Sequence, residues 1–568
     1  MAQLKDFQGI EGTNFFEQDH GFKSLLADLL PADDRPAVLS SLAECGRLAA
    51  GRWNELARDA SMPEQAPRIV KRDRVGNPVE RVDFGPLTTQ LRYEVADFGV
   101  LSPARTDLQR FGMIYLIAHN GEASLTCPIS CTDGLIRSIE ALGSNLLHDC
   151  CLPLIRSTDT PFAGAQFVTE RAGGSDVGAI ETEAMPDGEG GWSITGEKWF
   201  CSNPDEFFLV AARRAGAGPG TRGIGVFLVP RVLPDGKLNR VRFHRLKDKL
   251  GTRSLPTAEM TFDGATGYAI GEPADGFKTL MNYVINVSRI HNAVNACGFL
   301  HRAFLEARNY ARQREAFGKT LVEYPLIRET LVSLLEKLWR GRLLTFKLIG
   351  LVDKHGLVPA EDGQAMWQRF LINLAKYRTA STLTASIKEA ILLLGANGVV
   401  EDFSVLPRLL RDAMVIETWE GPHNTLCLQI VRDAAKSNLL ERWQSEMTEA
   451  LERWPSNLLS FTRVRLEQAV AEISDLITSE RIQNRDWAQA HARRLVDRLG
   501  SALEIAWMAE MAARHSDEDS TAALLTAAAR YYLLPAERLF DHPVMEALRE
   551  NGPALIDETP VRANVSRL

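Results

Sequence analysis

The sequence predicts a multidomain α+β protein in which a β-domain lies between two helical regions and a further helical segment follows. Apolar residues recur with the period of an α-helix up to about residue 161 and again from about residue 273. Between these points the period changes to two. We therefore expect an N-terminal helical domain at 1–161, a central β-domain at 162–272, a helical domain at 273–436 and a helical extension at 437–568.

Length and composition limit the classes of protein to be considered. A chain of 568 residues has room for about three or four domains of ordinary size. Apolar residues make up 45% of the chain and charged residues 24%, which is typical of soluble globular proteins, and the apolar runs are shorter than a membrane span. The first residues lack the basic region and apolar core of a secretory signal. We expect a cytoplasmic protein with no membrane partner.

Cysteine, histidine and charge exclude further classes. The eight cysteines include no CxxC pair, which indicates scattered thiols in a reducing compartment. The eleven histidines include no HExxH or similar spacing, so no metal site is predicted. A net charge of −8 argues against a general nucleic-acid binder.

The N-terminal region is predicted to be helical with one long interruption. Segments such as "FKSLLADLL" and "DGLIRSIEALGSNLL" have helical periodicity. The stretch 62–86, "MPEQAPRIVKRDRVGNPVERVDFGP", is rich in proline and charge, and it predicts a long loop inside this helical domain.

The β-domain is predicted from short alternating or apolar runs. Examples are "WSITGEKWF", "EFFLVAARR" and "IGVFLVP", and a Pro-Asp-Gly turn signal lies at 234–236. Because no helix separates these strands, we expect an antiparallel barrel or sandwich. The glycine-rich piece "GAGPGTRGIG" at 216–225 contains a proline and precedes a strand, so it predicts a hairpin loop and not a phosphate-binding loop.

Helical periodicity continues from residue 273 to the end of the chain. The segment 437–568 contains 15 arginines, no lysine and 21 carboxylates, and is therefore acidic. Its arginine pairs at i,i+4, Arg481 with Arg485 and Arg494 with Arg498, stand among carboxylates and predict a solvated, salt-bridged face.

Two polar segments of the β-domain form the first candidate site. "FVTERAGGSDVGAIETEA" at 167–184 supplies a hydroxyl at Thr169, glycines that allow close backbone approach, and Ser175 at a turn. "WSITGEKWFCSN" follows at 192–203. A hydroxyl-rich hairpin would explain either segment alone, but not both together.

This pair of segments resembles the flavin-contacting motifs of the acyl-CoA dehydrogenase family, T-E-x-x-x-G-S-D and N-G-x-K-x-W-[IF]-[TS]-N. The resemblance implies an FAD cofactor. It implies that the cofactor is contacted by Thr169, Gly174 and Ser175 from the first segment and by Phe200 and Ser202 from the second. Phe200 stands where many members have tryptophan.

Further motifs extend the resemblance over about residues 90–435. "YARQREAFGK" at 310–319 is similar to Y-A-x-x-R-x-x-F-G-K, whose arginine grips the cofactor diphosphate across a subunit interface. Arg314 and Phe317 therefore imply a homo-oligomer, and we expect a tetramer, although a dimer stays open. Leu392 occupies the position that usually carries a flavin-contacting glutamine.

"VIETWEGPHN" at 415–424 matches the segment of the family that carries the catalytic base. The residue before the glycine, Glu420, is implied to take a proton from the substrate, while Glu417 is expected to point elsewhere. Trp419 and Asn424 are implied to contact the cofactor, and Gly421 the substrate.

Two departures and one further position belong to this match. Pro422 and His423 replace the residues more usual after the glycine, and the proline removes one N–H donor. Arg289, in "NVSRIHNA", matches a helix position near the CoA side of the cleft.

The resemblance implies an acyl-CoA dehydrogenase fold with a helical N-terminal domain, a central antiparallel β-barrel or sandwich and a C-terminal four-helix bundle. "LTCPISCTDG" at 125–134 and the long extension resemble the AidB-like, alkylation-response branch. The implied reaction is oxidation of an acyl-CoA to its 2-enoyl-CoA, with an electron-transfer flavoprotein as acceptor. A flavin-containing, DNA-associated stress-response protein and an acyl-CoA oxidase remain as alternatives, and the acidic extension argues against DNA binding.

Overall fold

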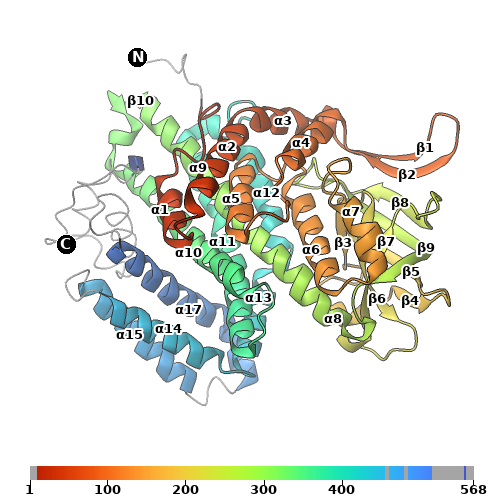
Figure 1. Ribbon diagram of the computed structural model, residues 1–568. Coiled ribbons are helices and arrows are strands. Elements are labelled where there is room, and N and C mark those ends of the chain that lie inside the picture. Colours follow the sequence, from red (N-terminus) through yellow and green to blue (C-terminus); the bar gives the residue numbers. More distant parts are fainter. Residues whose placement is uncertain (1–8, 455–459, 479–483, 515–555, 558–568) are drawn as a thin grey trace. The chain divides into compact units, whose positions relative to one another are not determined.

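The computed structural model describes residues 9–454, 460–478, 484–514 and 556–557 (Figure 1). The chain forms two compact units, each drawn from segments far apart in the sequence. Unit 1 comprises Met1–Gly51, Asp107–His119 and Asn292–Leu568, and unit 2 comprises Arg52–Thr106 and Asn120–His291. Helices precede the strands and helices follow them, as the periodicity predicts. The division into four consecutive domains stays a prediction.

Unit 1 is built from helices. Those before residue 436 are α1 (His20–Leu29), α2 (Arg35–Ala50), α5 (Asp107–Ile117), α9 (Asn286–Gln313), which begins in unit 2, α10 (Pro325–His355), α11 (Asp362–Leu394), α12 (Leu406–Thr418) and α13 (His423–Ala434). Helix α11 contacts α10, α12 and α13. Helices α10 and α11 are followed directly by Gly356 and Gly395, whose φ angles of 77° and 63° suit glycine at a helix C-terminus.

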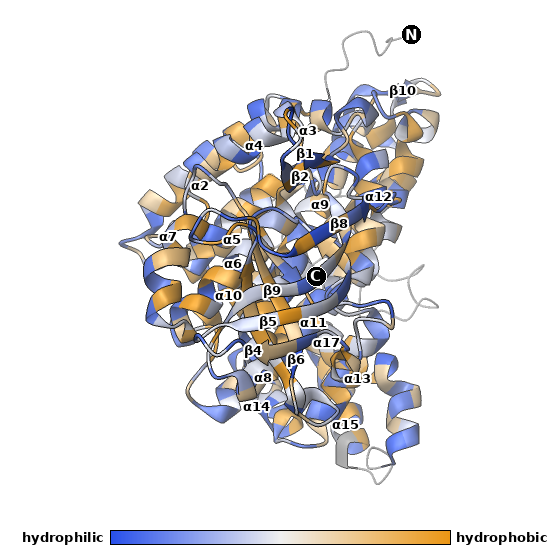
Figure 2. Cartoon of the chain, turned by 90° about the vertical axis from the view of Figure 1, so that its right-hand side faces the viewer, coloured by the Kyte–Doolittle hydropathy of each residue, from blue (hydrophilic) through white to orange (hydrophobic). Residues whose placement is uncertain are grey.

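The helical extension packs on this bundle. Its described helices are α14 (Leu439–Arg453), α15 (Ser460–Thr478) and α17 (Arg485–Arg514). Helix α17 contacts α10, α11 and α13, and Trp443 of α14 donates its indole N–H to the Leu499 carbonyl at 3.2 Å. Figure 2 shows hydrophobic and hydrophilic residues interspersed along helices such as α13 and α15. Residues 479–483 and most of the predicted extension after residue 514 lie outside the described residues.

Unit 2 combines short helices with the main sheet. Its helices of four or more residues include α3 (Arg52–Ala60), α4 (Pro86–Asp97), α6 (Thr126–Leu142), α7 (Leu152–Ile155) and α8 (Gly276–Thr279), with π-helical turns at Leu147–Cys151 and Leu280–Ile285. The prediction of a loop at 62–86 is wrong. This stretch forms an antiparallel hairpin of β1 (Arg68–Arg72) and β2 (Pro78–Asp83), in which Ile69 pairs with Val82. Its few apolar residues do not alternate regularly with charged ones, so the sequence lacks the period-two pattern of a half-buried strand.

The main sheet contains seven strands. They are β3 (Gly164–Phe167), β4 (Glu183–Pro186), β5 (Trp192–Ser202), β6 (Phe207–Arg214), β7 (Ile224–Pro230), β8 (Val241–Leu246) and β9 (Thr257–Ala269). The pairing order is β3-β6-β4-β5-β9-β7, and β7 also pairs with β6, so strands β6, β4, β5, β9 and β7 close into a ring. Most pairs are antiparallel as predicted, but β6 pairs in parallel with β3 and β4.

Strand β6 illustrates how the sheet is buried. Phe208, Val210 and Ala212 belong to one hydrophobic core with residues of the other strands, whereas Phe207 and Leu209 belong to a second core with residues of α6. Successive side chains point to opposite faces of a strand, so a strand covered on both faces is continuously apolar. The glycine-rich stretch 216–225 spans the connection between the antiparallel strands β6 and β7, which confirms the predicted hairpin loop.

Candidate active site

The first motif of unit 2 forms a tight turn beyond β3. Thr169 is half-buried and Ser175 is exposed. A Cβ atom at Gly174 would lie 2.4 Å from the Thr169 hydroxyl oxygen, so only glycine fits there. Gly173 has a φ of 129°, which also favours glycine. The turn therefore requires glycine at Gly174 because of the Thr169 hydroxyl and favours it at Gly173 because of the backbone conformation.

The second motif lies beside the first. The backbone N–H of Trp199 donates to the Thr169 carbonyl at 2.9 Å, which joins the two segments directly. Phe200 is 49% exposed on β5, with the Lys247 ammonium 4.6 Å from its ring centre. The Ser202 hydroxyl lies 3.0 Å from that of Thr257. An exposed aromatic with hydroxyls close by fits the planar, polar edge of a flavin.

A buried ion pair connects the two motifs. The Lys198 ammonium lies 2.6 Å from the Glu170 carboxylate, and the Thr182 hydroxyl donates to the same carboxylate at 2.6 Å. Burial alone would raise the pKa of Glu170, but Lys198 and the hydrogen bonds outweigh it and lower that pKa. Glu170 is the glutamate of the first motif and Lys198 the lysine of the second, so these two motif positions have a structural role here.

The asparagine that ends the second motif is also structural. Asn203 is buried with a φ of 54°, and its amide donates to the carbonyls of Phe162 and Gly164 at 2.7 and 2.8 Å. Its side-chain oxygen accepts from the buried Arg92 at 2.9 Å. These bonds fix the end of β5 and therefore the positions of Phe200 and Ser202.

Arg289 lies in the first turn of α9 and is 5% exposed. Nearby in the sequence, His291 Nε2 lies 2.9 Å from the Asp133 carboxylate, which also accepts from Arg137 at 3.0 Å. The predicted role of Arg289 at the CoA side of the cleft stays a prediction.

In unit 1, the predicted base stands on a sharp turn between two helices. Helix α12 ends at Thr418, and α13 begins at His423. Glu420 is half-buried and has a φ of 57°, and Gly421 has a φ of 101°. A residue other than glycine in this left-handed region costs about 1–3 kcal/mol unless its surroundings compensate, and such residues concentrate at functional sites.

A buried lysine holds this turn. Lys376 of α11 is fully buried, and its ammonium donates to the carbonyls of Glu417 at 3.2 Å and Gly421 at 3.1 Å. These two carbonyls flank Glu420 in the chain. Lys376 could not be predicted from the sequence, because nothing in the pattern of a long helix indicates which lysine reaches a turn 44 residues later.

The residues around the turn differ in exposure. Trp419 is half-buried at the C-terminal end of α12, whereas Asn424, in the first turn of α13, is exposed. The Glu417 carboxylate points to His423, with 4.0 Å between the carboxylate and Nε2. Burial, assisted by the Lys376 ammonium, lowers the pKa of His423, so this ring is neutral near pH 7.

The extension helix α17 reaches the same neighbourhood. The ring of Tyr377 meets His423 edge-on, with 5.6 Å between the ring centres. Its hydroxyl donates to Asp497 of α17 at 3.0 Å, and burial raises the pKa of Tyr377 to about 12. The extension therefore contacts Tyr377 of α11, whose ring packs against His423 in the first turn of α13.

The predicted interface residues follow α9. Arg314 precedes a small hairpin of β10 (Glu315–Ala316) and β11 (Lys319–Thr320), and its N–H donates to the Tyr310 carbonyl at 2.8 Å. Phe317 stands at the tip of this hairpin and is 96% exposed. The ring is therefore accessible to a partner subunit, although a single exposed apolar side chain does not by itself indicate an interface. Leu392, where the family usually has glutamine, is 60% exposed.

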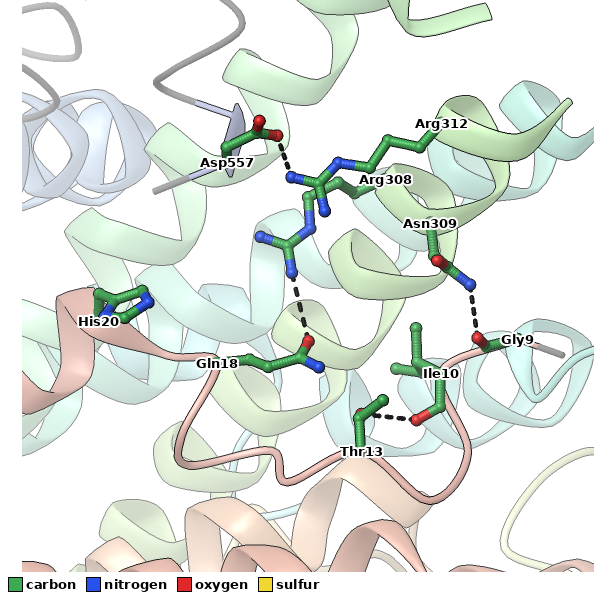
Figure 3. Close-up of a pocket in the computed structure, with 9 residues that line it drawn as sticks. All are labelled: Gly9, Ile10, Thr13, Gln18, His20, Arg308, Asn309, Arg312 and Asp557. Atoms are coloured by element: carbon green, nitrogen blue, oxygen red, sulfur yellow. Dashed lines mark hydrogen bonds and ion pairs between the residues drawn. The ribbon is translucent and has the colours of Figure 1, made fainter. Parts of the chain in front are cut away.

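A cavity of about 240 Å³ lies elsewhere in unit 1, and none of the predicted site residues lines it (Figure 3). Arg308 donates there to the Ile556 carbonyl at 3.2 Å, and Arg312 forms an ion pair with Asp557. Asn309 donates to the Gly9 carbonyl at 2.5 Å. These contacts hold residues 556–557 and the start of the described chain against α9.

A second buried polar cluster joins α1 to the bundle. Arg342 lies 2.6 Å from both carboxylate oxygens of Asp19, and the Tyr115 hydroxyl lies 2.7 Å from the same carboxylate and 2.8 Å from His301 Nδ1. Burial alone would raise the pKa of Asp19, but Arg342 and His301 hold it well below its usual value. Burial lowers the pKa of His301 to about 4. The cluster is fully enclosed and therefore structural.

The described residues also bear on metal binding and membrane insertion. No group of three or more His, Cys, Asp or Glu side chains in this part of the chain is arranged to hold a metal ion. None of the described helices is both long enough and apolar enough to cross a bilayer.

Comparison with known proteins identifies relatives over most of the chain. A family model described as the acyl-CoA dehydrogenase middle domain matches residues 165–265, and one described as the C-terminal domain matches 274–435. Acyl-CoA dehydrogenase family member 11 of Caenorhabditis elegans is 29% identical over 486 residues, which cover 82% of this chain and 78% of that protein. AidB of Escherichia coli is 31% identical over 395 residues, which cover 66% of this chain and 70% of that protein.

The fold has relatives of the same size. The crystal structure of Caenorhabditis elegans ACDH-11 in complex with C11-CoA superposes with a TM-score of 0.83 at 25% identity, covering 95% of this chain and 96% of that one. The fold predicted from the motifs is thereby confirmed, including the extra C-terminal helices. At its identity and coverage, the match to AidB shows that the two proteins belong to one family. The chain belongs to the acyl-CoA dehydrogenase family.

Proposed function

We propose that the protein is an FAD-dependent acyl-CoA dehydrogenase that converts an acyl-CoA thioester to its 2-enoyl-CoA, with Glu420 as the catalytic base. The observation that carries the proposal is the turn at Glu420, where a half-buried carboxylate stands in a left-handed conformation beside Trp419 and Gly421. A chain maintains such a conformation when the surrounding structure enforces it, and catalytic positions are common among such sites. Glu417 points towards His423 and does not form a catalytic pair with Glu420.

Each protein group has a task in this reaction. The Glu420 carboxylate accepts the proton from the carbon next to the thioester carbonyl, and its backbone N–H donates to the carbonyl oxygen as negative charge develops. FAD, when bound, supplies a hydride acceptor. Thr169, Ser175 and Ser202 hold the flavin by their hydroxyls, Phe200 packs against it, and the Gly174 backbone allows it to approach.

Other residues complete the binding site in this proposal. Trp419 and Asn424 contact the cofactor, and Gly421 and Arg289 contact the substrate. Arg314 reaches the diphosphate of a cofactor bound mainly by a partner subunit, with Phe317 in the interface, so the active protein is a homo-oligomer, and a tetramer is expected. The exposed ring of Phe317 is accessible to a partner in such an assembly.

The comparisons support an acyl-CoA as the substrate, and the electron acceptor is a separate part of the proposal. ACDH-11 is described in complex with C11-CoA, which supports an acyl-CoA with a medium or long chain. An electron-transfer flavoprotein is the proposed acceptor, and an oxidase would instead pass electrons to oxygen. We propose a cytoplasmic protein of fatty acid metabolism.

The decisive experiment is an anaerobic titration of the purified yellow protein with a panel of acyl-CoAs, following the flavin absorbance. Replacing Glu420 with Gln should slow acyl-CoA-dependent bleaching by at least about 100-fold, since a general base contributes 10²–10⁴-fold. The variant should still bind FAD.

The matched control is Glu417→Gln, which removes the other carboxylate of the same segment. It should bleach at nearly the wild-type rate. The proposed function would be refuted if the flavin of Glu420→Gln is bleached as fast as that of wild type. It would also be refuted if none of the acyl-CoAs bleaches the wild-type flavin.

A further inference from the structure

A buried ammonium group of α11 contacts the turn that carries Glu420. Lys376 lies in the middle of α11 and is 0% exposed. Its Nζ donates to the Glu417 carbonyl at 3.2 Å and to the Gly421 carbonyl at 3.1 Å. One acceptor lies three residues before Glu420 and the other one residue after it.

Each of these acceptors has a physical reason to require a donor. Glu417 is in the last turn of α12, where carbonyls have no partner within the helix and the helix dipole favours a cation. Gly421 lies between the two helices, outside the backbone bonds of both. A lysine can donate three hydrogen bonds, and bonds from a charged donor are the stronger kind. Lys376 therefore bridges the end of α12 to the chain just before α13.

The bridge encloses the one residue of the turn that is in an unfavourable conformation. Glu420 has a φ of 57°, which residues other than glycine and asparagine adopt rarely. With its neighbours tied to the same ammonium group, the backbone at Glu420 has little freedom to return to an ordinary conformation. The direction of the carboxylate depends on that backbone.

We propose that Lys376 is a positioning residue that fixes the Glu420 turn by bridging the carbonyls of Glu417 and Gly421. This inference rests on the proposed function of Glu420 as the base. Lys376 itself contacts neither substrate nor cofactor in this scheme. It acts only through the orientation of Glu420, and a small misplacement of a catalytic group can reduce a rate by about 100-fold.

The test compares Lys376→Met with Lys376→Arg. Methionine fills a similar volume but donates no hydrogen bond, whereas arginine retains a cation with several donors. The matched control is Lys388→Met, which removes an exposed lysine from the same helix. All variants are prepared as the full-length, FAD-loaded protein, and the rate constant of flavin reduction and the KM are measured with the best acyl-CoA substrate.

Lys376→Met should reduce flavin about 10- to 100-fold more slowly while its KM changes less than about threefold, because binding groups are untouched. The kinetic isotope effect with α-deuterated acyl-CoA should increase, since proton removal becomes more strongly rate-limiting. Lys376→Arg should recover most of the rate, and Lys388→Met should match wild type.

A readout independent of activity is amide hydrogen exchange in the peptide 412–426. The turn should exchange about tenfold faster in Lys376→Met than in wild type, with other peptides unchanged. Unchanged exchange in this peptide, or an unchanged flavin reduction rate, would overturn the proposal. If Lys376→Met does not yield folded protein, Lys376→Arg decides, and a rate as low as that of Glu420→Gln would contradict the bridging role.

These outcomes separate the two proposals. A wild-type protein that bleaches, together with an inactive Glu420→Gln and an unaffected Lys376→Met, would leave the dehydrogenase function in place and remove only the role of Lys376. If none of the acyl-CoAs bleaches the flavin of the wild-type protein, both proposals fail.

Discussion

Two buried lysines, one in each unit, contact the two segments that carry the proposed site residues, and they hold these segments in different ways. Lys198 of unit 2 pairs at 2.6 Å with the Glu170 carboxylate, next to Thr169. Lys376 of unit 1 donates to two backbone carbonyls around Glu420. Lys198 and Glu170 are two buried charges, and each compensates the other. Lys376 instead fixes the conformation of the backbone whose carbonyls it contacts.

The two lysines differ in what their replacement would disturb. Removing one member of a buried ion pair leaves the other charge uncompensated, which costs stability. Removing a donor from two carbonyls costs less stability, but it releases the turn that they flank. Changes at Lys198 should therefore affect folding first, and changes at Lys376 should affect the reaction first.

The largest expected effect on stability is that of Lys198→Met. The change leaves the Glu170 carboxylate buried without its cation, and it should lower the free energy of unfolding by about 3–5 kcal/mol. Urea unfolding at pH 7, with Lys376→Met alongside, measures the contrast. Lys376→Met should lose only about 1–3 kcal/mol.

The double variant Lys198→Met/Glu170→Gln is the control for this prediction. It removes the uncompensated charge but keeps a side-chain oxygen that can accept from the Thr182 hydroxyl, so much of the lost stability should return. If the double variant is no more stable than Lys198→Met, the uncompensated charge is not the cause of the loss.

A smaller effect is expected from acid. Because the folded protein lowers the pKa of Glu170, the ion pair contributes stability that is present above about pH 4.5 and lost as the pH falls through the lowered value. The stability of Glu170→Gln should therefore fall less steeply below pH 4.5 than that of wild type. Urea midpoints at pH 7, 4.5 and 3.5 measure this, and equal slopes would contradict the assignment.

The smallest effect is expected where both charges face solvent. Arg498 of α17 lies 3.3 Å from Glu472 of α15, and their side chains are 61% and 66% exposed. Arg498→Ala should change the free energy of unfolding by less than about 0.5 kcal/mol. A loss as large as that of Lys198→Met would show that exposure does not separate the two kinds of ion pair.

Much of the fold could be predicted because its signals are local. The change from helical to strand periodicity located the β-domain, and the proline inside 216–225 identified a hairpin loop. The hairpin at 68–83 was missed because its apolar residues are few. The parallel pairing of β6 with β3 and β4 was also missed, since periodicity does not specify which strands become neighbours.

The candidate site divides in the same way. Thr169 and Gly174 can be read from a short motif, because a hydroxyl and a glycine five residues apart meet in a single turn. The connection between Lys376 and Gly421 spans two helices, and the one between Tyr377 and Asp497 involves the extension. No short pattern encodes such pairs.

The sequence by itself determined the family, the order of helices and strands, and the residue that is proposed as the base, because these depend on local periodicity and on motifs of fewer than about twenty residues. Only the tertiary structure decided which charged side chains become buried and what they hold. That choice depends on packing between distant segments, where the cost of removing a charge from water is met by a particular partner. For this protein, it assigns Lys198 to an ion pair and Lys376 to the turn at Glu420.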